Sequence, residues 1–517
     1  MAGWWALLFA SDALDKYLSA HSDRAIISIQ FSDANFAVYF VADERICERP
    51  RTSPENGQPP GACPILLLPA EILAEIFTQV QVGESRSAAS LLVMRGINRH
   101  WCAIADMTPA LWSNVNIKAG QDLDAPSTFL SRSSSYPITL SISGTASTRI
   151  QTFTPEEFRA WAVKCAIILS AHIHHCRSLS IVEHWAEADT LSKLIEVLAL
   201  VPAPMLQELI VTPEFTVNHP FHKLQPNIFE GGIPSVTRAQ FTLTGLYHCT
   251  IPFSGITELH LGGAGDLFLS FPRFCSLVEE CTQLTTLGIY NNVVEIFPQP
   301  YQRSCHLPNL LSLQIYGTMN AVSELLLCLS VPNLAELAVI PIVIEDFKLL
   351  LSRTLTEPKT LFPRVTRLFM APTVYHSGMT EDSIYAAMTC FPNVEHLLLV
   401  NFNTKAFSYA FTSDDRGRPV PWPELRTISI RNVTEATEHT INKFLEHRAT
   451  SGFPIPTIQI DPESVQVIKI RKTRPRFAYE IGDPWSGLLQ HMIRSNGAGL
   501  RDLYAVVVHE SDSEADN

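Results

Sequence analysis

A short phrase that recurs from about residue 175 onward restricts the folds open to this chain more than any other feature of its sequence. The phrase is an apolar residue, two variable residues, a second apolar residue, one variable residue and a third apolar residue. Eight clear copies begin at Leu206, Ile256, Leu284, Leu310, Leu334, Val365, Val394 and Leu425, a degenerate copy begins at Val236, and an early partial copy covers 176–181. Copies this numerous and this similarly spaced indicate a structural repeat rather than a chance pattern.

The spacing of the copies predicts the kind of repeat. The first apolar positions from 206 to 425 are separated by 30, 20, 28, 26, 24, 31, 29 and 31 residues. This range is that of leucine-rich repeats, in which each unit is a strand followed by a helix or an irregular turn. Each phrase ends in period-two alternation, as a short strand with one buried face requires. Several phrases follow a proline, which suits an irregular entry into a strand: Pro308, Pro332, Pro363, Pro392 and Pro423.

Stacking of such units is obligatory, because a single unit cannot bury its own apolar edge. We therefore predict an α/β fold in which residues 118–505 form a leucine-rich-repeat-like solenoid with a parallel sheet on its inner curve. The variable residues of the phrases would be exposed on that inner face. Those expected to contact a bound target protein are Glu258, His260, Gln314, Tyr316, Glu336, Arg367, Glu395, His396, Arg426 and Ser429. For each of them the alternative is a solvated position with no binding role.

Residues 64–117 have a different, helical pattern. Pro69 suits the first position of a helix, where its missing amide hydrogen is no loss, and the apolar residues from Ile72 to Val80 recur at helical spacing until Gly83. Further helical stretches run from 88 to 97 and from about 98 to 106, and 114–117 is strand-like. A module this small does not easily bury all its apolar side chains. Its apolar stripe is therefore either a binding surface for a partner or part of one larger core.

The residues of this module resemble the F-box of a large fungal F-box protein family. The match begins with Leu68-Pro69-x-Glu71-Ile72-Leu73-x-Glu75-Ile76-Phe77, continues with Leu91-Leu92-x-x-Arg95-x-Ile97-Asn98-Arg99-x-Trp101-x-x-Ile104-Ala105, and ends with Thr108-Pro109-x-Leu111-Trp112. Where the family usually reads Val-Cys-Arg-x-Trp, this chain has Gly96-Ile97-Asn98-Arg99-His100-Trp101. The apolar and aromatic positions of the pattern are present, although the match covers only about a tenth of the chain.

The resemblance implies that the module docks onto the Skp-family adaptor of a cullin-RING ubiquitin ligase. The residues carried over to that interface are Leu68, Pro69, Ile72, Leu73, Ile76, Phe77, Leu91 and Trp101. An interface of the helix-in-groove kind, anchored by aliphatic and aromatic side chains, needs a stripe of this type. Some of these side chains, Trp101 in particular, have the alternative of filling the module's own small core.

The remaining segments are interpreted from their composition. Residues 1–48 mix apolar and acidic stretches without a clear period, and residues 49–63, which are rich in proline and glycine, are a predicted linker. Residues 506–517 are a predicted acidic disordered tail, whose phosphorylation at Ser511 or Ser513 the sequence leaves open. The apolar start of the chain lacks the basic region of a secretory signal.

Charge and cysteine content narrow the choice of partners and location. The 517 residues include 51 acidic and 38 basic ones, with a net charge of −13, which would repel a phosphate backbone, so no nucleic-acid partner is expected. The 11 cysteines contain no C-x-x-C pair and are odd in number, which favours reduced thiols in a cytoplasmic or nuclear protein. No apolar run is long enough to cross a bilayer, so no membrane partner is expected.

No pattern of catalytic or metal-binding residues stands out, and no cofactor is expected. The segment from His172 to Cys176 contains three histidines and a cysteine, but no second cluster accompanies it, so we interpret it as the end of the helical stretch 156–171. The glycine-rich segment 261–266 lacks the lysine and the third glycine of nucleotide-binding loops and is interpreted as a turn between repeats. The chain is therefore expected not to be an enzyme.

Three functional hypotheses follow. In the first, the protein is the substrate-recognition subunit of a Skp/cullin/F-box type ubiquitin ligase, which binds the adaptor through the F-box and an unknown target protein through the repeats. In the second, it is a leucine-rich-repeat scaffold that binds proteins without any ligase, and the helical module is an N-terminal cap. In the third, it is an enzyme whose site has no recognisable sequence pattern.

Overall fold

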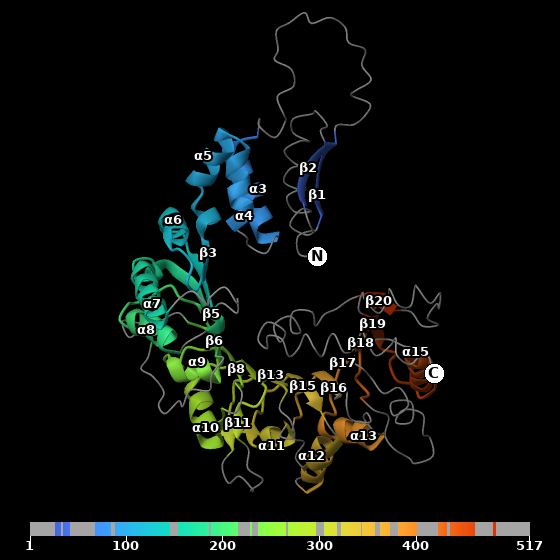
Figure 1. The fold of residues 1–517 in the computed structure, drawn as a ribbon. Helices are drawn as coiled ribbons and strands as arrows, with labels where there is room; N and C mark the ends of the chain where they lie inside the picture. Colours follow the sequence, from blue (N-terminus) through green and yellow to red (C-terminus); the bar gives the residue numbers. More distant parts are fainter. Residues whose placement is uncertain are drawn as a thin grey trace, which may run out of the picture. The chain divides into compact units, whose positions relative to one another are not determined.

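The computed structural model describes residues 26–32, 35–41, 68–83, 88–144, 154–185, 188–215, 228–229, 236–264, 267–295, 304–317, 322–342, 344–356, 362–372, 381–400, 422–431, 435–460 and 479–481. The predicted linker 49–63 and tail 506–517 lie outside them. The chain divides into two compact units (Figure 1). We call Met1–Asn116 with Asp122–Leu140 the helical unit, and Ile117–Gln121 with Ser141–Asn517 the sheet unit.

Three successive helices characterise the helical unit. They are α3 (Ala70–Gly83), α4 (Ala88–Ile97) and α5 (Arg99–Met107), followed by the 3-10 turn η2 (Pro109–Trp112) and α6 (Asp124–Ser133). The helical stretches expected from the sequence are thus present, and α3 ends at Gly83. Asn98 caps α5, because its side chain accepts a hydrogen bond from the backbone amide of Trp101 at 2.8 Å. In the N-terminal segment, β1 (Ile26–Ser32) and β2 (Asn35–Val41) pair in antiparallel fashion.

The helical unit has its own closed core. Leu73, Leu91 and Trp112 are at most 1% exposed. The ring centroids of Phe77 and Trp101 lie 4.9 Å apart, which joins α3 to α5. The indole nitrogen of Trp112 donates a hydrogen bond to the carbonyl oxygen of Ala105 at 2.7 Å. Side chains from α3, α4, α5 and η2 therefore pack against one another and form the core of this unit.

Among the described residues, the largest sheet has 14 strands, and the protein is an α/β protein with a large parallel sheet. The strand order is β3-β4-β5-β6-β7-β8-β10-β13-β15-β16-β17-β18-β19-β20, and every pair from β5 to β20 is parallel. The strands are β3 (Asn114–Lys118), β4 (Ile138–Ser143), β5 (Cys176–Trp185), β6 (Glu208–Phe215), β7 (Arg238–Thr242), β8 (Glu258–Gly262), β10 (Thr286–Tyr290), β13 (Ser312–Tyr316), β15 (Glu336–Ile342), β16 (Arg367–Pro372), β17 (His396–Val400), β18 (Thr427–Arg431), β19 (Thr457–Ile460) and β20 (Tyr479–Ile481). Two further parallel pairs, β9 (Leu269–Ser270) with β11 (Val294–Glu295) and β12 (Cys305–His306) with β14 (Leu329–Ser330), lie outside this sheet.

The recurring phrases align in register across this sheet. Their second apolar residues pair strand by strand in one row, together with Ile458 of β19: Leu179, Leu209, Ala239, Leu259, Leu287, Leu313, Leu337, Leu368, Leu397, Ile428 and Ile458. Every member of the row is at most 1% exposed. Because side chains alternate along a strand, the residues on either side of this row point to the opposite face of the sheet.

Helices connect many of the strands. They are α7 (Pro155–Ser170), α8 (Ala188–Ala199), α9 (Leu243–His248), α10 (Phe271–Glu280), α11 (Val322–Leu327), α12 (Ile344–Thr356), α13 (Glu381–Cys390) and α15 (Glu435–Thr450). In Figure 1, α10 to α13 lie on the same side of strands β8 to β16. Helix α7 begins with a capping box, in which Thr154 and Glu157 exchange side-chain to backbone hydrogen bonds.

Asparagines at one position of the phrase tie consecutive phrases together. The amide nitrogens of Asn309, Asn333 and Asn393 donate to backbone carbonyl oxygens that lie 25 to 30 residues earlier, at 2.7–2.9 Å. Each of these residues immediately precedes the first apolar residue of its phrase. These asparagine side chains therefore link each segment that enters a strand to the equivalent segment one phrase earlier.

Candidate protein-binding surfaces

The residues predicted to bind an adaptor come together in one cluster of the helical unit, but most of them fill its core. Leu68, Leu73, Phe77, Leu91 and Trp101 are each at most 8% exposed and belong to the same core cluster. Ile72 and Ile76 are half-buried and pack against that cluster, whereas Pro69 is exposed. The alternative role, a place in the module's own core, therefore holds for those five residues. Only Pro69, Ile72 and Ile76 keep surface that a partner can contact.

Helix α4 carries an exposed apolar face that the sequence analysis did not single out. Leu92, Val93 and Ile97 are 56%, 50% and 47% exposed, although Leu91 and Met94 of the same helix are buried. A Cβ atom at Gly96, on the same exposed face, would meet no atom within 4 Å. The sequence signal was present, because Leu92, Val93 and Ile97 are apolar in addition to the buried Leu91 and Met94, and apolar residues on two faces of a helix usually indicate that both faces are covered.

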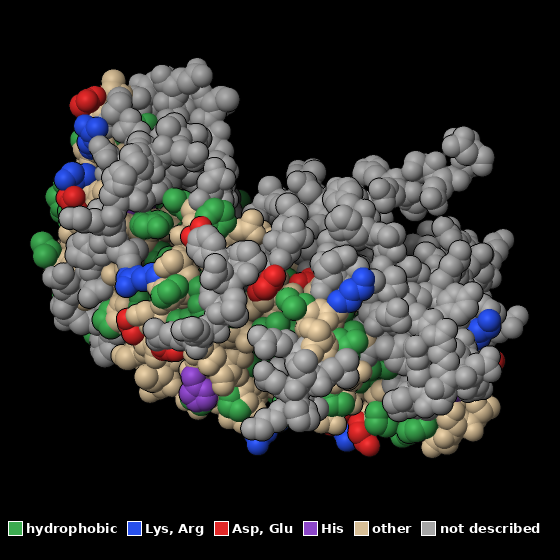
Figure 2. All heavy atoms as spheres, turned by 90° about the horizontal axis from the view of Figure 1, so that it is seen from below, with side chains coloured by type: hydrophobic (Ala, Val, Ile, Leu, Met, Phe, Trp, Pro, Cys, Tyr) green, Lys and Arg blue, Asp and Glu red, His purple; other side chains and the backbone are tan. Residues whose placement is uncertain are grey.

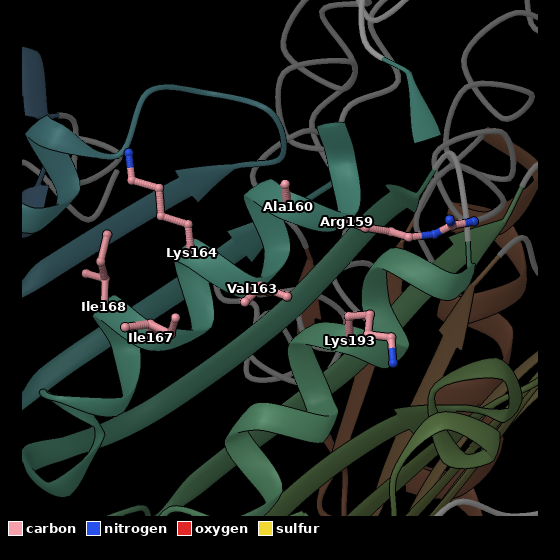
Figure 3. Close-up of a pocket in the computed structure, with 7 residues that line it drawn as sticks. All are labelled: Arg159, Ala160, Val163, Lys164, Ile167, Ile168 and Lys193. Carbon is pink, nitrogen blue, oxygen red and sulfur yellow. The ribbon is translucent and has the colours of Figure 1, made fainter. Parts of the chain in front are cut away.

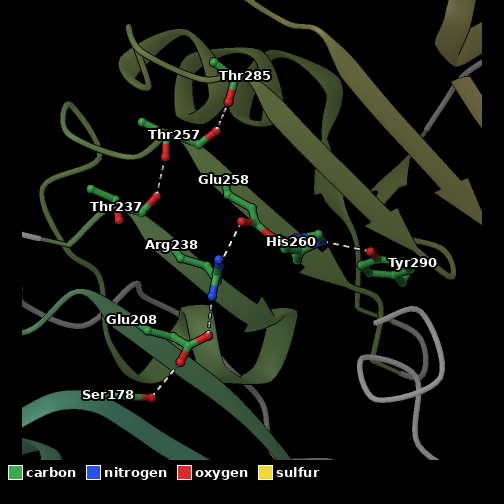
Figure 4. Close-up of polar contacts among 9 residues, drawn as sticks. All are labelled: Ser178, Glu208, Thr237, Arg238, Thr257, Glu258, His260, Thr285 and Tyr290. Atoms are coloured by element: carbon green, nitrogen blue, oxygen red, sulfur yellow. Dashed lines mark hydrogen bonds and ion pairs between the residues drawn. The ribbon is translucent and has the colours of Figure 1, made fainter. Parts of the chain in front are cut away.

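Polar side chains form a chain of contacts across the sheet unit (Figure 4). The guanidinium group of Arg238 on β7 lies between two carboxylates, with 3.1 Å to Glu208 of β6 and 2.8 Å to Glu258 of β8. The hydroxyl group of Ser178 on β5 donates to the other oxygen of Glu208 at 2.7 Å. Glu208, Arg238 and Glu258 occupy the same position of their phrases, so the strand register brings residues 30 and 20 positions apart side by side.

His260 continues this chain of contacts toward β10 and β13. Its Nε2 atom donates to the Glu258 carboxylate at 2.9 Å, and its Nδ1 atom lies 2.8 Å from the hydroxyl oxygen of Tyr290. The Tyr290 hydroxyl group in turn donates to the side-chain oxygen of Gln314 at 2.8 Å. Gly288, which pairs with His260 in the sheet, makes this possible, because a Cβ atom there would overlap the imidazole ring and lie 2.6 Å from the Tyr290 hydroxyl oxygen.

Neighbouring groups shift the pKa values of Glu258 and Arg238. The hydrogen bond from His260 is the largest cause that lowers the pKa of Glu258 from 4.5 to about 2, and the contacts with Arg238 add to it while burial opposes it. The hydrogen bond to Glu258 likewise raises the pKa of Arg238. Glu258 is therefore an ionised carboxylate that accepts hydrogen bonds from His260 and Arg238. This arrangement stabilises the sheet and leaves Glu258 a poor general acid or base.

Similar pairs follow further along the same face. Arg367 of β16 forms an ion pair with Glu336 of β15, and Arg426 contacts Glu395 at 3.1 Å. His396 lies 2.6 Å from the hydroxyl oxygen of Thr427 on β18, and burial is the first cause that lowers the pKa of its imidazole, followed by the charge of Arg367. Charged and polar residues at the phrase positions thus pair with the neighbouring strand.

The exposure predicted for the target-binding residues is correct only in part. His260, Gln314, Tyr316 and Ser429 are at most 6% exposed, so the expectation that they lie open on a face of the sheet is wrong. Glu258, Glu336, Arg367, Glu395 and His396 are half-buried, and Arg426 is exposed. Adjacent strands lie only about 4.8 Å apart, so side chains in one row cover each other and the polar ones pair along the row. Glu208, Arg238 and Tyr290 were missed, although alternating acidic and basic residues at one phrase position were a usable signal.

The described residues contain no metal-binding constellation. No group of three or more His, Cys, Asp or Glu residues among them is arranged to hold an ion. Helix α7 ends at Ser170, before the histidine cluster, and ring nitrogens of His174 and His175 lie 3.2 Å apart. Burial lowers the pKa of His175, and the neighbouring histidines add to the effect. The histidines thus follow the helix, and Ile173–His175 form a 3-10 turn that leads into β5.

Cysteines in the described part of the chain form no disulfide and are mostly buried. All nine of them are free thiols, and Cys102 alone among these nine is half-buried rather than buried. Burial raises the pKa of Cys165, Cys249 and Cys281 to about 12. These thiols are therefore protonated at neutral pH and poor nucleophiles.

One face of the molecule carries charges of both signs. On the face drawn in Figure 2, acidic and basic side chains are scattered among apolar ones. No helix within the described ranges is both long enough and apolar enough to span a bilayer. A comparison of the sequence with models of protein families finds no matching family, and a comparison with curated proteins finds no significantly similar one.

Proposed function

We propose that this protein is the substrate-recognition subunit of a Skp/cullin/F-box type ubiquitin ligase. One observation carries the proposal: a three-helix unit whose sequence resembles an F-box has a closed core and still exposes the apolar face Leu92, Val93 and Ile97. Exposed apolar side chains gathered on one helix are typical of a protein-binding surface. The adaptor contact would use this face together with Pro69, Ile72 and Ile76, while the buried residues of the motif hold the helices in place.

Target binding is assigned to the sheet unit, which we infer to be a leucine-rich-repeat-like solenoid with the parallel sheet on its inner curve. The continuous row of paired apolar residues and the asparagines that bridge consecutive phrases support this inference. Arg426 and the half-buried ion pairs are the polar groups left for contact with a target. The protein would act in the cytoplasm or nucleus and raise the concentration of its target near the ligase, without bond chemistry of its own.

The adaptor interface is tested with the full chain and a purified Skp-family adaptor. The double variant Val93→Asp/Ile97→Asp changes side chains that are 50% and 47% exposed, so the fold is retained and binding should weaken at least about tenfold. Leu311→Asp, at a 49% exposed position of the sheet unit, is the matched control and should bind as wild type does. The absence of adaptor binding by the wild-type chain, or equal binding by the double variant and the control, would overturn the proposal.

The second candidate function is a protein-binding scaffold without a ligase. It is favoured by the burial of Leu73, Phe77 and Leu91, because a helical cap needs these residues only for its own core. In that case the wild-type chain would capture its target protein from cell extract but would not retain the adaptor. Co-purification with mass spectrometry separates the two functions in one experiment, since adaptor and cullin peptides appear only in the first.

A further inference from the structure

Helix α7 of the sheet unit carries a second apolar stripe besides its buried one. Ala162, Cys165 and Leu169 are at most 1% exposed and face the core. Helical spacing places Val163 and Ile167 on the other side of the helix, where they are 37% and 59% exposed. Surface helices normally have polar residues on that side. The packing of the described residues therefore does not account for this stripe.

The stripe lines an open groove of about 580 Å³ between α7 and α8 (Figure 3). Val163, Ile167 and Ile168 supply most of its apolar lining, and Lys193 borders it from α8. Figure 3 shows Val163 between the two helices, with Arg159 and Lys193 toward one end and Lys164 further along α7. Its volume is that of a typical binding site for a small ligand or a few side chains.

The charge of the groove is opposite to that of the whole chain. Its lining includes Arg159, Lys164 and Lys193 and no acidic residue, whereas the chain has a net charge of −13. Arg159 and Lys193 approach glutamates of their own helices at 3.9 and 2.7 Å, and these side chains are 42% and 47% exposed. Exposed ion pairs of this kind contribute little to stability. A carboxylate of a bound partner can therefore replace these glutamates as the counterion of Arg159 and Lys193.

We infer that this groove binds an amphipathic helix of another protein, one that presents apolar side chains flanked by Asp or Glu. From Ala160 to Ile167 the lining of α7 extends over seven residue steps, or about 10 Å, which matches two turns of a docked helix. Apolar anchors at positions i, i+3 or i+4, and i+7 are the usual means of such docking. The apolar lining and the small number of cations favour a helix over an anionic membrane surface. This inference is independent of adaptor binding and goes beyond the proposed function.

The test is a selection of 16-residue peptides from a random display library on the immobilised full chain. Selected peptides are synthesised with a fluorophore, and their affinities for three variants are compared. Ile167→Asp removes an apolar contact and should weaken binding about tenfold or more. Lys164→Glu/Lys193→Glu should weaken it by a similar factor. Ile455→Asp, at a 61% exposed position outside the groove, and Lys443→Glu are the matched controls and should leave affinity unchanged.

Several outcomes distinguish the inference from its rivals. Enrichment of acidic residues and of apolar residues at helical spacing, with loss of binding in both groove variants, supports it. Selected peptides without acidic residues, or with equal affinity for groove variants and controls, overturn it. Vesicles of phosphatidylserine and phosphatidylcholine provide a second probe. If the wild-type chain binds them, Ile167→Asp does not, and no peptide is selected, the groove is a membrane contact and the inference is wrong.

Discussion

The helical unit and the sheet unit use apolar residues in opposite ways. In the helical unit, a few large side chains such as Leu73, Phe77 and Trp101 meet once, in a small core with no repetition. In the sheet unit, one row of residues repeats from strand to strand, and each member packs beside its equivalents. Each core residue of the helical unit therefore has an environment of its own. In the sheet unit, the environment of a residue is set by the equivalent residues on the neighbouring strands. The same comparison shows why the sequence analysis overestimated the exposure of the predicted binding residues. Several of them are buried in the core of the helical unit, and others are buried between neighbouring strands of the sheet unit.

The largest expected effect is local to the helical unit. Phe77→Ala removes a ring that is 2% exposed and lies 4.9 Å from that of Trp101, so it should destabilise this unit by about 3–5 kcal/mol. Hydrogen exchange followed by mass spectrometry should show loss of protection in α3 and α5, with β10 and β13 unchanged. Equal loss of protection in both units would mean that they unfold together, and the comparison would fail.

The next effect concerns pH and the contacts of Glu258. Its pKa is lowered from 4.5 to about 2 in the folded protein, so its contribution to stability is complete above pH 4.5 and is lost as the pH falls toward 2. At about 1.4 kcal/mol per pH unit, and allowing for its partial exposure, this amounts to roughly 2–3 kcal/mol.

Glu258→Gln tests this directly. The free energy of unfolding, measured by urea titration with circular dichroism at pH 5 and pH 3, should differ less between the two pH values in the variant than in the wild type. The same pH dependence in both proteins would show that Glu258 is not a main source of acid sensitivity.

A smaller effect is expected at Gly288. Adding a methyl group in Gly288→Ala forces the stacked His260 and Tyr290 rings to move, since the new atom would lie 2.6 Å from the Tyr290 hydroxyl oxygen. Overpacking of this kind costs about 1–3 kcal/mol. The urea midpoint should fall, and the double variant Gly288→Ala/His260→Ala should recover part of the loss. No recovery would indicate that the ring pair is not the cause.

The smallest effect is expected at Arg426. Its side chain is 67% exposed and its ion pair with Glu395 is 3.1 Å long, so Arg426→Ala should change the free energy of unfolding by less than about 1 kcal/mol. Arg238→Ala, which removes the bridge between two carboxylates, is the contrasting variant and should cost more. A larger loss at Arg426 than at Arg238 would contradict the stabilising role given to the contacts among Glu208, Arg238 and Glu258.

Much of the secondary structure could be predicted from the sequence. The helices α3 to α5 follow from the apolar spacing, Gly83 and Asn98, and ten strands of the sheet coincide with the recurring phrase. The strands β19 and β20 were missed, because they lie beyond the last clear copy and β19 keeps only a short Ile-x-Ile pattern. The binding residues were harder to predict, since a variable position in a phrase does not indicate whether the neighbouring strand will cover it.

The sequence by itself determined the spacing of the recurring phrase, the apolar row and the helical pattern of residues 70–107, because these depend on spacing along the chain. Only the tertiary structure decided that Arg238 lies between Glu208 and Glu258, that His260 is buried against Tyr290, and that α4 and α7 keep apolar faces exposed. The physical reason is that exposure and pairing depend on which residues distant in sequence become neighbours. In a parallel sheet, register sets those neighbours; in a small helical core, the closing of the core does.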